Sequence, residues 1–365
     1  MKRIILTVTN DLSFDQRMMR ICDSLAKAGY SVLLVGRKLR YSIPLRKQSY
    51  HQKRLPCFFS KGKLFYVEYN LRLFLFLLTR KTACICAIDL DTIIPCYWAS
   101  VLRRTKRVYD AHELFTEMDE IISRPAIHRT WLRIEKSMVP RFRLGYTVCD
   151  SIASEFRKRY NVNYQVIRNV PVPYDLQPKT APEKYILYQG AVNKGRGLKK
   201  LAEAMREVSG KLYICGEGNF FDTLRDYVKK EGLEEKVLFT GYLEPTALRE
   251  MTQQAYIAVN PFEATGLNQY LSLANKFFDY IQAGIPQVTM NYPEYRKIND
   301  EFGVAVLIED LQPSNLAGAI NNLLENDVLH EAIRERCLRA RLQLNWEKEE
   351  AKLVQFYQQE VFGLE

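Results

Sequence analysis

The chain has 365 residues, of which 47% are hydrophobic and 26% charged. This length exceeds one ordinary domain core, and the composition excludes an intrinsically disordered chain. The formal net charge of +11, with an isoelectric point near 9.1, predicts an acidic partner such as nucleic acid, anionic lipid or a phosphorylated small molecule.

The eight cysteines form no C-x-x-C pair and stand mostly in apolar runs, which predicts reduced thiols in a cytosolic protein. The first residues lead directly into a strand-like run without a signal-peptide pattern. The most apolar stretch, residues 71–78, is far shorter than the ~20 residues that a membrane span needs. We therefore expect a cytoplasmic protein without a membrane-spanning segment.

The first half of the chain alternates strand-like and helix-like segments. Residues 4–8 predict a strand, and a helix follows from about Asp15 and closes at Gly29. Helices that follow strands through short joins are typical of βαβ units, so residues 1–170 predict a doubly wound domain with a parallel sheet. Further strands of this domain are expected at residues 31–35, 84–88 and 107–109.

Residues 171–184 contain four prolines and no hydrophobic periodicity, which predicts a linker. A second alternating series over residues 185–345 predicts another domain, and residues 346–365 predict a closing helix. The expected fold class is α/β, with two Rossmann-like domains whose parallel sheets face a central cleft. Strands of the second domain are expected at residues 185–188, 212–215, 237–239, 256–259 and 287–290, and helices at 198–208, from about 221, at 246–254 and at 272–283.

The segment QGAVNKGRGL follows the strand at 185–188. Gly190, Gly195 and Gly197 would let backbone amides approach a ligand. Lys194 and Arg196 add positive charge, so the segment predicts a diphosphate cradle, although a glycine-rich turn with solvated charges is equally compatible. It is not a P-loop, because Arg196 and Gly197 stand where that motif needs Lys and then Ser or Thr.

Three further strand ends carry glycine or small polar residues, and together they predict a nucleotide lying across the second domain. A lone G-x-G is weak evidence, since tight turning also explains it. The candidate residues at these ends are Gly216 and Gly218 in GEGNF, Tyr242 and Leu243 in TGYL, and Glu263, Gly266 and Leu267 in NPFEATGLNQY.

The segment SLANKFFDYIQAGIP predicts an amphipathic helix that Gly284 ends. On its polar face, an ionised Asp279 could accept two ribose hydroxyls. Lys276 could sit near phosphate or pair with Asp279, and a solvated surface pair is the alternative. The polar face comprises Ser272, Asn275, Lys276, Asp279 and Gln282.

In this order, GAVNKGRGL, GEG, FTGYL and SLANKFFDYIQAGIP resemble the nucleotide-binding half of glycosyltransferase family 4, the retaining sugar transferases with the GT-B fold. The segments TNDLSFDQRMMR, AIDLDTIIP and VYDAHELFTE are similar to a bacterial branch of that family used in polysaccharide assembly. The resemblance implies an acceptor-binding first domain, a nucleotide-sugar-binding second domain, and a terminal helix that crosses back to the first domain. It also implies a hexosyltransferase-type activity.

By this resemblance Arg196 binds the donor diphosphate, Gly190 opens its loop, Asp279 grips the ribose and His112 faces the donor sugar. Three departures stand out: Leu271 replaces the first acid of the family's pair, the second acid is Asp rather than Glu, and Ala191 replaces an arginine. The lost contacts would pass to Lys194 and to Glu263 or amides near Gly266. The expected catalytic residues are His112, Arg196 and Lys194, and the expected donor-binding residues are Gly190, Gly216, Gly218, Tyr242, Leu243, Glu263, Gly266, Leu267, Lys276 and Asp279.

Cations and helix amides around a leaving diphosphate would stabilise its charge without a metal ion, so we expect neither a metal nor a cofactor besides a UDP- or GDP-linked donor. Asp89 and Asp91 form a D-x-D pair, interpreted here as strand-end structure or acceptor lining. Glu113 and Glu117, spaced by one helical turn, offer a glycosidase pair as an alternative. His112 is the better catalytic candidate, with a structural histidine as the alternative.

Residues 36–67 contain nine Lys or Arg and no acidic residue. With the apolar residues 71–78, the basic stretch 37–64 predicts peripheral contact with the inner face of an anionic membrane and a glycan or lipid-linked acceptor. Aromatic interleaving also suits single-stranded nucleic acid, but no recognised motif accompanies it, so we expect no nucleic-acid partner. The alternative is that the basic stretch is a solvated loop attached to a core helix.

Two rival functions stay open. A nucleotide-sugar 2-epimerase-like isomerase shares the two-domain architecture but would need additional acids and a histidine around the cleft. A non-catalytic subunit that binds a nucleotide sugar is the other, because Leu271 stands where the family carries an acid.

Overall fold

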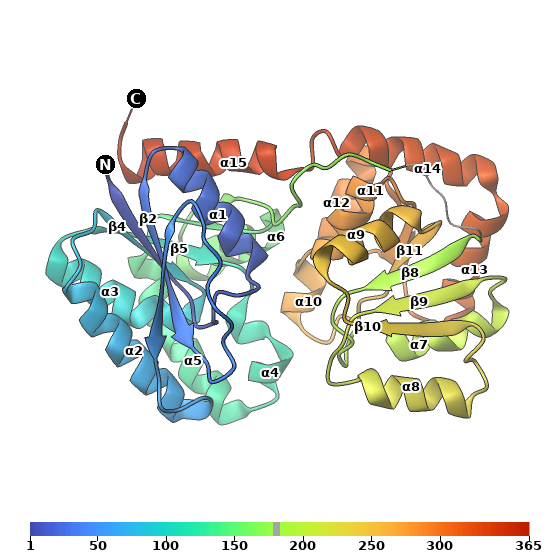
Figure 1. Cartoon of the computed structure of the whole chain (residues 1–365), viewed down its shortest axis with the longest axis horizontal. Helices are drawn as coiled ribbons and strands as arrows, with labels where there is room; N and C mark the ends of the chain where they lie inside the picture. The colour runs from blue at the N-terminus through green and yellow to red at the C-terminus, as the bar shows by residue number, and fades with distance from the viewer. Residues whose placement is uncertain (178–182, 365) are drawn as a thin grey trace. The chain divides into compact units, whose positions relative to one another are not determined.

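The computed structural model describes residues 1–177 and 183–364, and the chain divides into two compact units (Figure 1). Unit 1 comprises Met1–Asn169 and the segment from Glu349 onward, and unit 2 comprises Val170–Lys348. The sequence placed these boundaries after residues 170 and 345. Part of the predicted linker, residues 178–182, lies outside the described residues.

The sheet of unit 1 has seven strands in the order β3-β2-β1-β4-β5-β6-β7, all paired in parallel. The order reverses between β1 and β4, which is where ligands bind in doubly wound sheets. The strands are β1 Arg3–Thr7, β2 Ser31–Lys38, β3 His51–Pro56, β4 Cys84–Ile88, β5 Lys106–Ala111, β6 Gly145–Thr147 and β7 Gln165–Val166.

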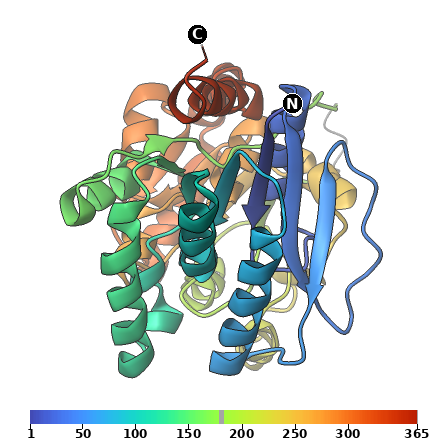
Figure 2. The ribbon, with the colours of Figure 1, turned by 90° about the vertical axis from the view of Figure 1, so that its left-hand side faces the viewer.

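Helices cover the sheet of unit 1, and Figure 2 shows α2, α3 and α5 side by side on one of its faces. The first helix begins where the sequence predicts, because the Asp15 carboxylate accepts a hydrogen bond from the Met18 amide at 3.0 Å. The helices are α1 Gln16–Lys27, α2 Gly62–Leu78, α3 Ile93–Arg103, α4 Asp119–Ile122, α5 Pro125–Met138 and α6 Asp150–Tyr160.

The end of the chain belongs to unit 1. Helix α15 (Trp346–Gln355) continues into a wider turn at Phe356–Val361, whose buried Phe356 ring packs edge-on against Tyr146 at 5.4 Å. The Glu349 carboxylate accepts a hydrogen bond from the Arg168 amide at 2.9 Å. Buried aromatic contacts therefore hold this segment to the sheet.

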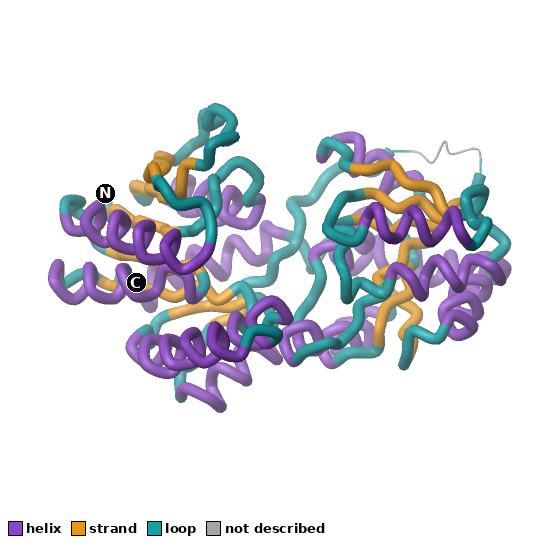
Figure 3. The backbone as a smooth tube through the Cα atoms, turned by 90° about the horizontal axis from the view of Figure 1, so that it is seen from below, coloured by secondary structure: helices purple, strands orange, loops and turns teal. Residues whose placement is uncertain are grey.

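The sheet of unit 2 has six parallel strands in the order β10-β9-β8-β11-β12-β13, which reverses between β8 and β11. Figure 3 shows helices beside the strands in each unit. The strands are β8 Tyr185–Gln189, β9 Lys211–Cys215, β10 Val237–Gly241, β11 Ile257–Asn260, β12 Gln287–Met290 and β13 Ala305–Ile308. The helices are α7 Leu198–Ala204, α8 Phe221–Lys230, α9 Pro245–Gln254, α10 Leu267–Leu271, α11 Asn275–Ala283, α12 Pro293–Phe302, α13 Pro313–Glu325 and α14 Asp327–Ala340.

Two predictions about helices were wrong in detail. The amphipathic helix begins at Asn275 rather than residue 272, because the chain is extended at Ser272 and Ala274, where the Ala274 amide donates to the Tyr295 hydroxyl at 2.9 Å. The α-helix at Leu198 ends at Ala204 and tightens into a 3-10 turn. Within residues 1–177 and 183–364, no helix combines the length and apolarity that a membrane span requires.

Candidate functional site

The carboxyl ends of β8 and β11 meet at the reversal of strand order in unit 2. The two loops that follow them touch, since the Glu263 amide donates to the Gly195 carbonyl at 3.1 Å. At Gly197, where φ is +65°, a side-chain Cβ would lie 2.3 Å from the Pro261 carbonyl oxygen. Glycine is therefore required there by the backbone conformation and by the close approach of the second loop.

Arg196 belongs to the loop after β8, and its guanidinium stacks on the buried ring of Phe262 in the loop after β11, with 4.3 Å between Cζ and the ring centroid. Stacking fixes the plane of a guanidinium and leaves its edge donors to bind an oxyanion. The tertiary structure thus holds Arg196 at the start of α7, where the sequence predicted a diphosphate cradle.

Lys276 reaches the same loop from α11. The side chain is buried, and its Nζ lies 3.6 Å from the centroid of the Tyr188 ring. A Cβ at Gly190, where φ is +120°, would lie 3.2 Å from that Nζ. Burial first and Arg196 second lower the pKa of Lys276 well below its usual value, against the opposing effect of Asp279. Arg196 and Lys276 therefore converge on the glycine loop, and a bound anion would favour the protonated form of Lys276.

Asp279, half-buried on α11, accepts a hydrogen bond from Gln189 Nε2 at 2.9 Å. Gln189 is held in place, because its Oε1 accepts a hydrogen bond from the Thr252 hydroxyl at 2.6 Å and its backbone N–H donates to the Tyr280 hydroxyl at 3.1 Å. Sequence reasoning missed Gln189, although a polar last residue in an apolar strand at the switch point was the available signal.

Gly216 and Gly218, which follow β9, allow their loop to pack closely against the glycine loop after β8. A Cβ at Gly216 would lie 2.0 Å from the Gly190 carbonyl oxygen, and one at Gly218 would lie 2.3 Å from Asn193 Oδ1. The Asn219 amide donates to the same Asn193 oxygen at 2.9 Å. These contacts position the glycine loop and account for the G-x-G pattern as tight turning.

The remaining candidates of unit 2 are less engaged. Lys194 and Tyr242 have exposed side chains, and Leu243 packs at the edge of the core cluster beneath β8. Glu263 and Gly266 precede the five-residue helix α10, which starts at Leu267 and is separated from the amphipathic helix α11 by a break. Leu271 ends that short helix, so its spacing from Asp279 crosses a helix break.

Gln282 corrects the predicted polar face. It is fully buried, and its Nε2 donates to the carbonyl oxygens of Arg341 at 3.1 Å and Leu344 at 3.0 Å. These carbonyls follow α14, so Gln282 ties the end of that helix to α11 and does not line the glycine loop.

His112 belongs to unit 1, at the carboxyl end of β5. Its Nε2 lies 3.1 Å from Asp110 Oδ2 and its Nδ1 lies 3.5 Å from Asp89 Oδ2. The His112 amide also donates to Asp89 Oδ1 at 2.8 Å. Asp110 is fully buried, and its other oxygen accepts from the buried Arg17 guanidinium at 3.1 Å.

The charges of this cluster decide its protonation. Burial lowers the pKa of His112, but Asp110 and Asp89 outweigh it and raise the pKa to about 9. Burial also acts to raise the pKa of Asp110, yet Arg17 and His112 hold it below the usual value. A pKa of about 9 favours the imidazolium form of His112 at neutral pH, between Asp110 and Asp89, although burial raises the pKa of Asp89 to about 7. His112 therefore suits a fixed cation better than a proton acceptor.

The two aspartates of the D-x-D pair at the end of β4 form hydrogen bonds with other residues of unit 1. Asp89 has φ +52° and ψ −179°, a region that is nearly exclusive to glycine and costs about 1–3 kcal/mol. Asp91 accepts a hydrogen bond from the Thr9 hydroxyl at 3.1 Å, and burial raises the pKa of Asp91 to about 6. In the described part of the chain, no group of three or more His, Cys, Asp or Glu residues is arranged to hold a metal ion.

The glycosidase alternative finds no support in the geometry. Glu113 precedes a 3-10 turn at Phe115–Glu117, so the two acids do not share an α-helix as their spacing suggested. Glu117 forms a 2.6 Å ion pair with Arg159.

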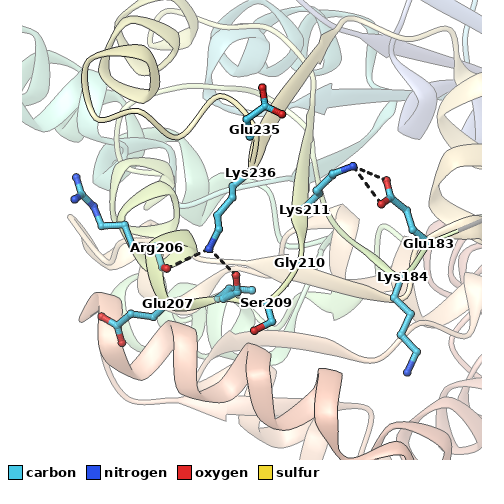
Figure 4. A pocket seen from close by; sticks show the side chains of 10 residues that line it. Glu183, Lys184, Arg206, Glu207, Ser209, Gly210, Lys211, Glu235 and Lys236 are labelled. Atoms are coloured by element: carbon cyan, nitrogen blue, oxygen red, sulfur yellow. Dashed lines mark hydrogen bonds and ion pairs between the residues drawn. The ribbon is translucent and has the colours of Figure 1, made fainter.

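A hollow of about 470 Å³ opens near the starts of β8, β9 and β10, the edge of the sheet opposite the glycine loop. Figure 4 shows Lys211 directed toward Glu183, with which it forms an ion pair at 3.1 Å. Lys236 Nζ donates to the carbonyls of Met205, Arg206 and Val208. These lysines are already paired within the fold, so the hollow lacks the cluster of basic side chains that lies at the glycine loop.

Residues 176–339 match the family model described as glycosyl transferases group 1. The match includes the glycine loop and Arg196 as well as Lys276 and Asp279. Unit 2 is therefore built around a domain of the group 1 type. The match does not test the prediction that the chain belongs to family 4, which is a narrower class than group 1.

The chain is also similar to an uncharacterised glycosyltransferase of Methanocaldococcus jannaschii, with 25% identity over 150 residues. That match covers 40% of this chain and 36% of the relative, about a third of the relative's length.

Solved structures agree with the chain over nearly their whole length. Sucrose-phosphate synthase of Thermosynechococcus elongatus superposes with a TM-score of 0.78 at 16% identity, covering 98% of this chain and 99% of that one. HepE of Anabaena in complex with UDP-glucose gives a TM-score of 0.75 at 12% identity, covering 97% and 99%. At these identities the likeness shows the fold, and the predicted GT-B class with two Rossmann-like domains is confirmed.

Proposed function

We propose that this protein is a retaining glycosyltransferase that moves a sugar from a nucleotide-sugar donor to an acceptor. The observation that carries the proposal is the convergence of Arg196 and Lys276 on the Gly190 loop, at the switch point of a group 1 domain. Residues 190–197 contain no acidic residue, and a diphosphate would supply the negative charge that Arg196 and a protonated Lys276 require.

The chemistry follows from where charge develops. Breaking the glycosyl bond leaves negative charge on the diphosphate, and Arg196, Lys276 and the loop amides would stabilise that charge without a metal ion. The hydrogen bond from Gln189 orients the Asp279 carboxylate, which would accept the ribose hydroxyls. The family resemblance assigns the donor sugar to His112, and as an imidazolium it would act there as a cation.

The acceptor is the finer part of the proposal. The amino-terminal motifs resemble enzymes of polysaccharide assembly, and the basic residues 37–64 favour a lipid-linked diphosphate acceptor at the inner face of an anionic membrane. Glu68 is the only acidic residue between positions 37 and 88, so this part of unit 1 carries a strong positive field.

Thermal-shift measurements with UDP, GDP and ADP test donor binding. A nucleotide at 100 times its Kd stabilises the folded protein by about 2.7 kcal/mol. We expect one of the three to raise the Tm, and Arg196→Ala to remove most of that rise while Lys200→Ala, at an exposed lysine on α7, leaves it unchanged. If no nucleotide or nucleotide sugar shifts the transition, the proposal fails.

Turnover separates the rival functions. The donor that binds is incubated with and without a lipid-linked acceptor, and the product is analysed by NMR for its anomeric configuration. Transfer with retention supports the proposal. An epimerised donor formed without acceptor identifies the isomerase, and donor binding without any turnover identifies the non-catalytic subunit.

A further inference from the structure

Helix α2 is apolar on two opposite faces although it lies at the surface of unit 1. A helix that is hydrophobic all round is normally enclosed by protein or lipid. Its inner stripe packs on the sheet, whereas the outer stripe stays more than half exposed, as at Val67 with 67%. The inner residues are Phe65, Tyr69, Leu73 and Leu77, and the outer residues are Leu64, Val67, Leu71 and Leu75.

Helix α3 adds a second exposed stripe. The two helices lie side by side on the same face of the sheet (Figure 2). Both leave apolar side chains exposed. Trp98 is 50% exposed, which is unusual for a large aromatic residue in the middle of a helix. The exposed residues of α3 are Ile94, Trp98, Val101 and Leu102.

The turn before α2 is built to present aromatic rings. The Glu68 carboxylate accepts hydrogen bonds from the amides of Phe58 and Phe59, the closest at 2.9 Å, and an ion pair with Arg72 at 2.8 Å holds it. Phe58 is nevertheless 85% exposed. Glu68, the one acidic residue between positions 37 and 88, therefore stabilises the turn in which the Phe58 side chain is exposed to solvent.

Positive charge borders the apolar residues at both ends of α2 and at the end of α3. Lys61 and Lys63 stand at the start of α2, Arg80 and Lys81 follow its end, and Arg103 ends α3. An apolar centre with a cationic border matches the hydrocarbon and the phosphate levels of an anionic bilayer. Tryptophan is enriched at that level of membranes, which agrees with an exposed Trp98.

We propose that α2, α3 and the Phe58–Phe59 turn form one docking surface that enters the interface of an anionic bilayer. The inference deepens the proposed function, from which it takes the lipid-linked acceptor. It also revises the membrane contact predicted for residues 71–78, because Leu73 and Leu77 are buried in unit 1 and α3 supplies residues that the sequence did not indicate.

Flotation with vesicles tests the surface. The full chain is mixed with vesicles of phosphatidylglycerol and phosphatidylcholine, and with vesicles of phosphatidylcholine alone. We expect binding to the anionic vesicles, and a loss of about tenfold or more in the partition coefficient for Trp98→Glu and for Leu71→Glu. Val328→Glu, at an 81% exposed residue of unit 2, is the matched control and should bind like the unchanged chain.

Nucleotide binding distinguishes a failed docking surface from a failed function. Trp98→Glu should keep the thermal shift given by the nucleotide, and an unchanged circular dichroism spectrum would show that unit 1 of the variant also folds. Equal vesicle binding by the chain and both variants would overturn the proposal. So would dimerisation seen in sedimentation velocity that Trp98→Glu abolishes while no form binds vesicles, because the face would then join two copies of the chain.

Discussion

The ammonium nitrogen of Lys276 lies 3.6 Å from the centroid of the Tyr188 ring, in a buried part of unit 2. The ring cannot turn away easily, since its hydroxyl donates to the Ala191 carbonyl at 2.8 Å. The face of an aromatic ring replaces part of the lost hydration of a cation but not all of it. The charge of an arriving ligand would consequently change the protonation of Lys276.

Binding of a nucleoside diphosphate should take up protons. Burial and Arg196 lower the pKa of Lys276 in the empty site, and a bound diphosphate raises it again. Calorimetry at pH 8 in two buffers of different ionisation enthalpy measures this uptake. Lys276→Met should abolish it and weaken binding about 10- to 100-fold, the value of a charged hydrogen bond. Lys200→Met, at an exposed lysine of α7, should change neither quantity, and unchanged uptake in Lys276→Met contradicts the assignment.

Asp279 and Gln282, three residues apart on α11, should respond oppositely to substitution. Asp279→Asn should weaken nucleotide binding with little change in stability, because Gln189 can still bond to the amide oxygen. Gln282→Leu removes the donor to the Leu344 carbonyl and should lower the free energy of unfolding by about 1–3 kcal/mol. Urea unfolding and nucleotide titration of both variants check this, and equal binding loss in the two would place Gln282 in the site after all.

Glycine at 197 should be irreplaceable. Alanine would bring Cβ against the Pro261 carbonyl in a left-handed conformation, and we expect a loss of about 2 kcal/mol or more in the free energy of unfolding. Gly318→Ala is the matched control, because this glycine lies inside helix α13 with no atom within 4 Å of its Cβ. That variant should be more stable by about 0.5–1 kcal/mol. A tolerated alanine at 197 would mean that the two loops separate readily.

The pair of His112 and Asp110 should weaken in alkali. The folded-state pKa of His112, about 9, lies above its usual value of 6.5, so its stabilisation is fully present below pH 6.5 and is lost as the pH rises through about 9. The shift corresponds to about 3 kcal/mol. The difference in unfolding free energy between the chain and His112→Gln should shrink toward zero between pH 7 and pH 10, followed by fluorescence of Trp98 and Trp131 in unit 1. A difference independent of pH in this range would show an uncharged histidine.

Several elements could be predicted from the sequence because one local signal sufficed. The strands at 84–88 and 287–290 were confirmed to the residue, since short apolar runs between polar turns leave little choice of boundary. Helix α11 was placed correctly only at its end, where Gly284 adopts the left-handed conformation. Its start was wrong because the break at Ser272 and Ala274 depends on Tyr295 from another helix.

The candidate site divides in the same way. Gly190, Arg196 and Asp279 could be proposed from their motifs, and what each touches could not. Arg196 stacks on Phe262 from the loop after β11, and Asp279 on α11 accepts a hydrogen bond from Gln189 at the end of β8. Nothing in the pattern of residues 190–197 points to Phe262, and the pattern around Asp279 does not point to Gln189.

The amino-acid sequence by itself determined the alternation of strands and helices in both halves, the glycine-rich turns and the sign of the charge, because these depend on neighbouring residues along the chain. Only the tertiary structure decided that Lys276 is buried on Tyr188, that Gln282 supports a helix end, and that α2 and α3, neighbours on one face of the sheet, each leave apolar side chains exposed. Burial and the meeting of distant side chains arise when the sheet brings separate segments together, and burial is what changes the energy of a charge.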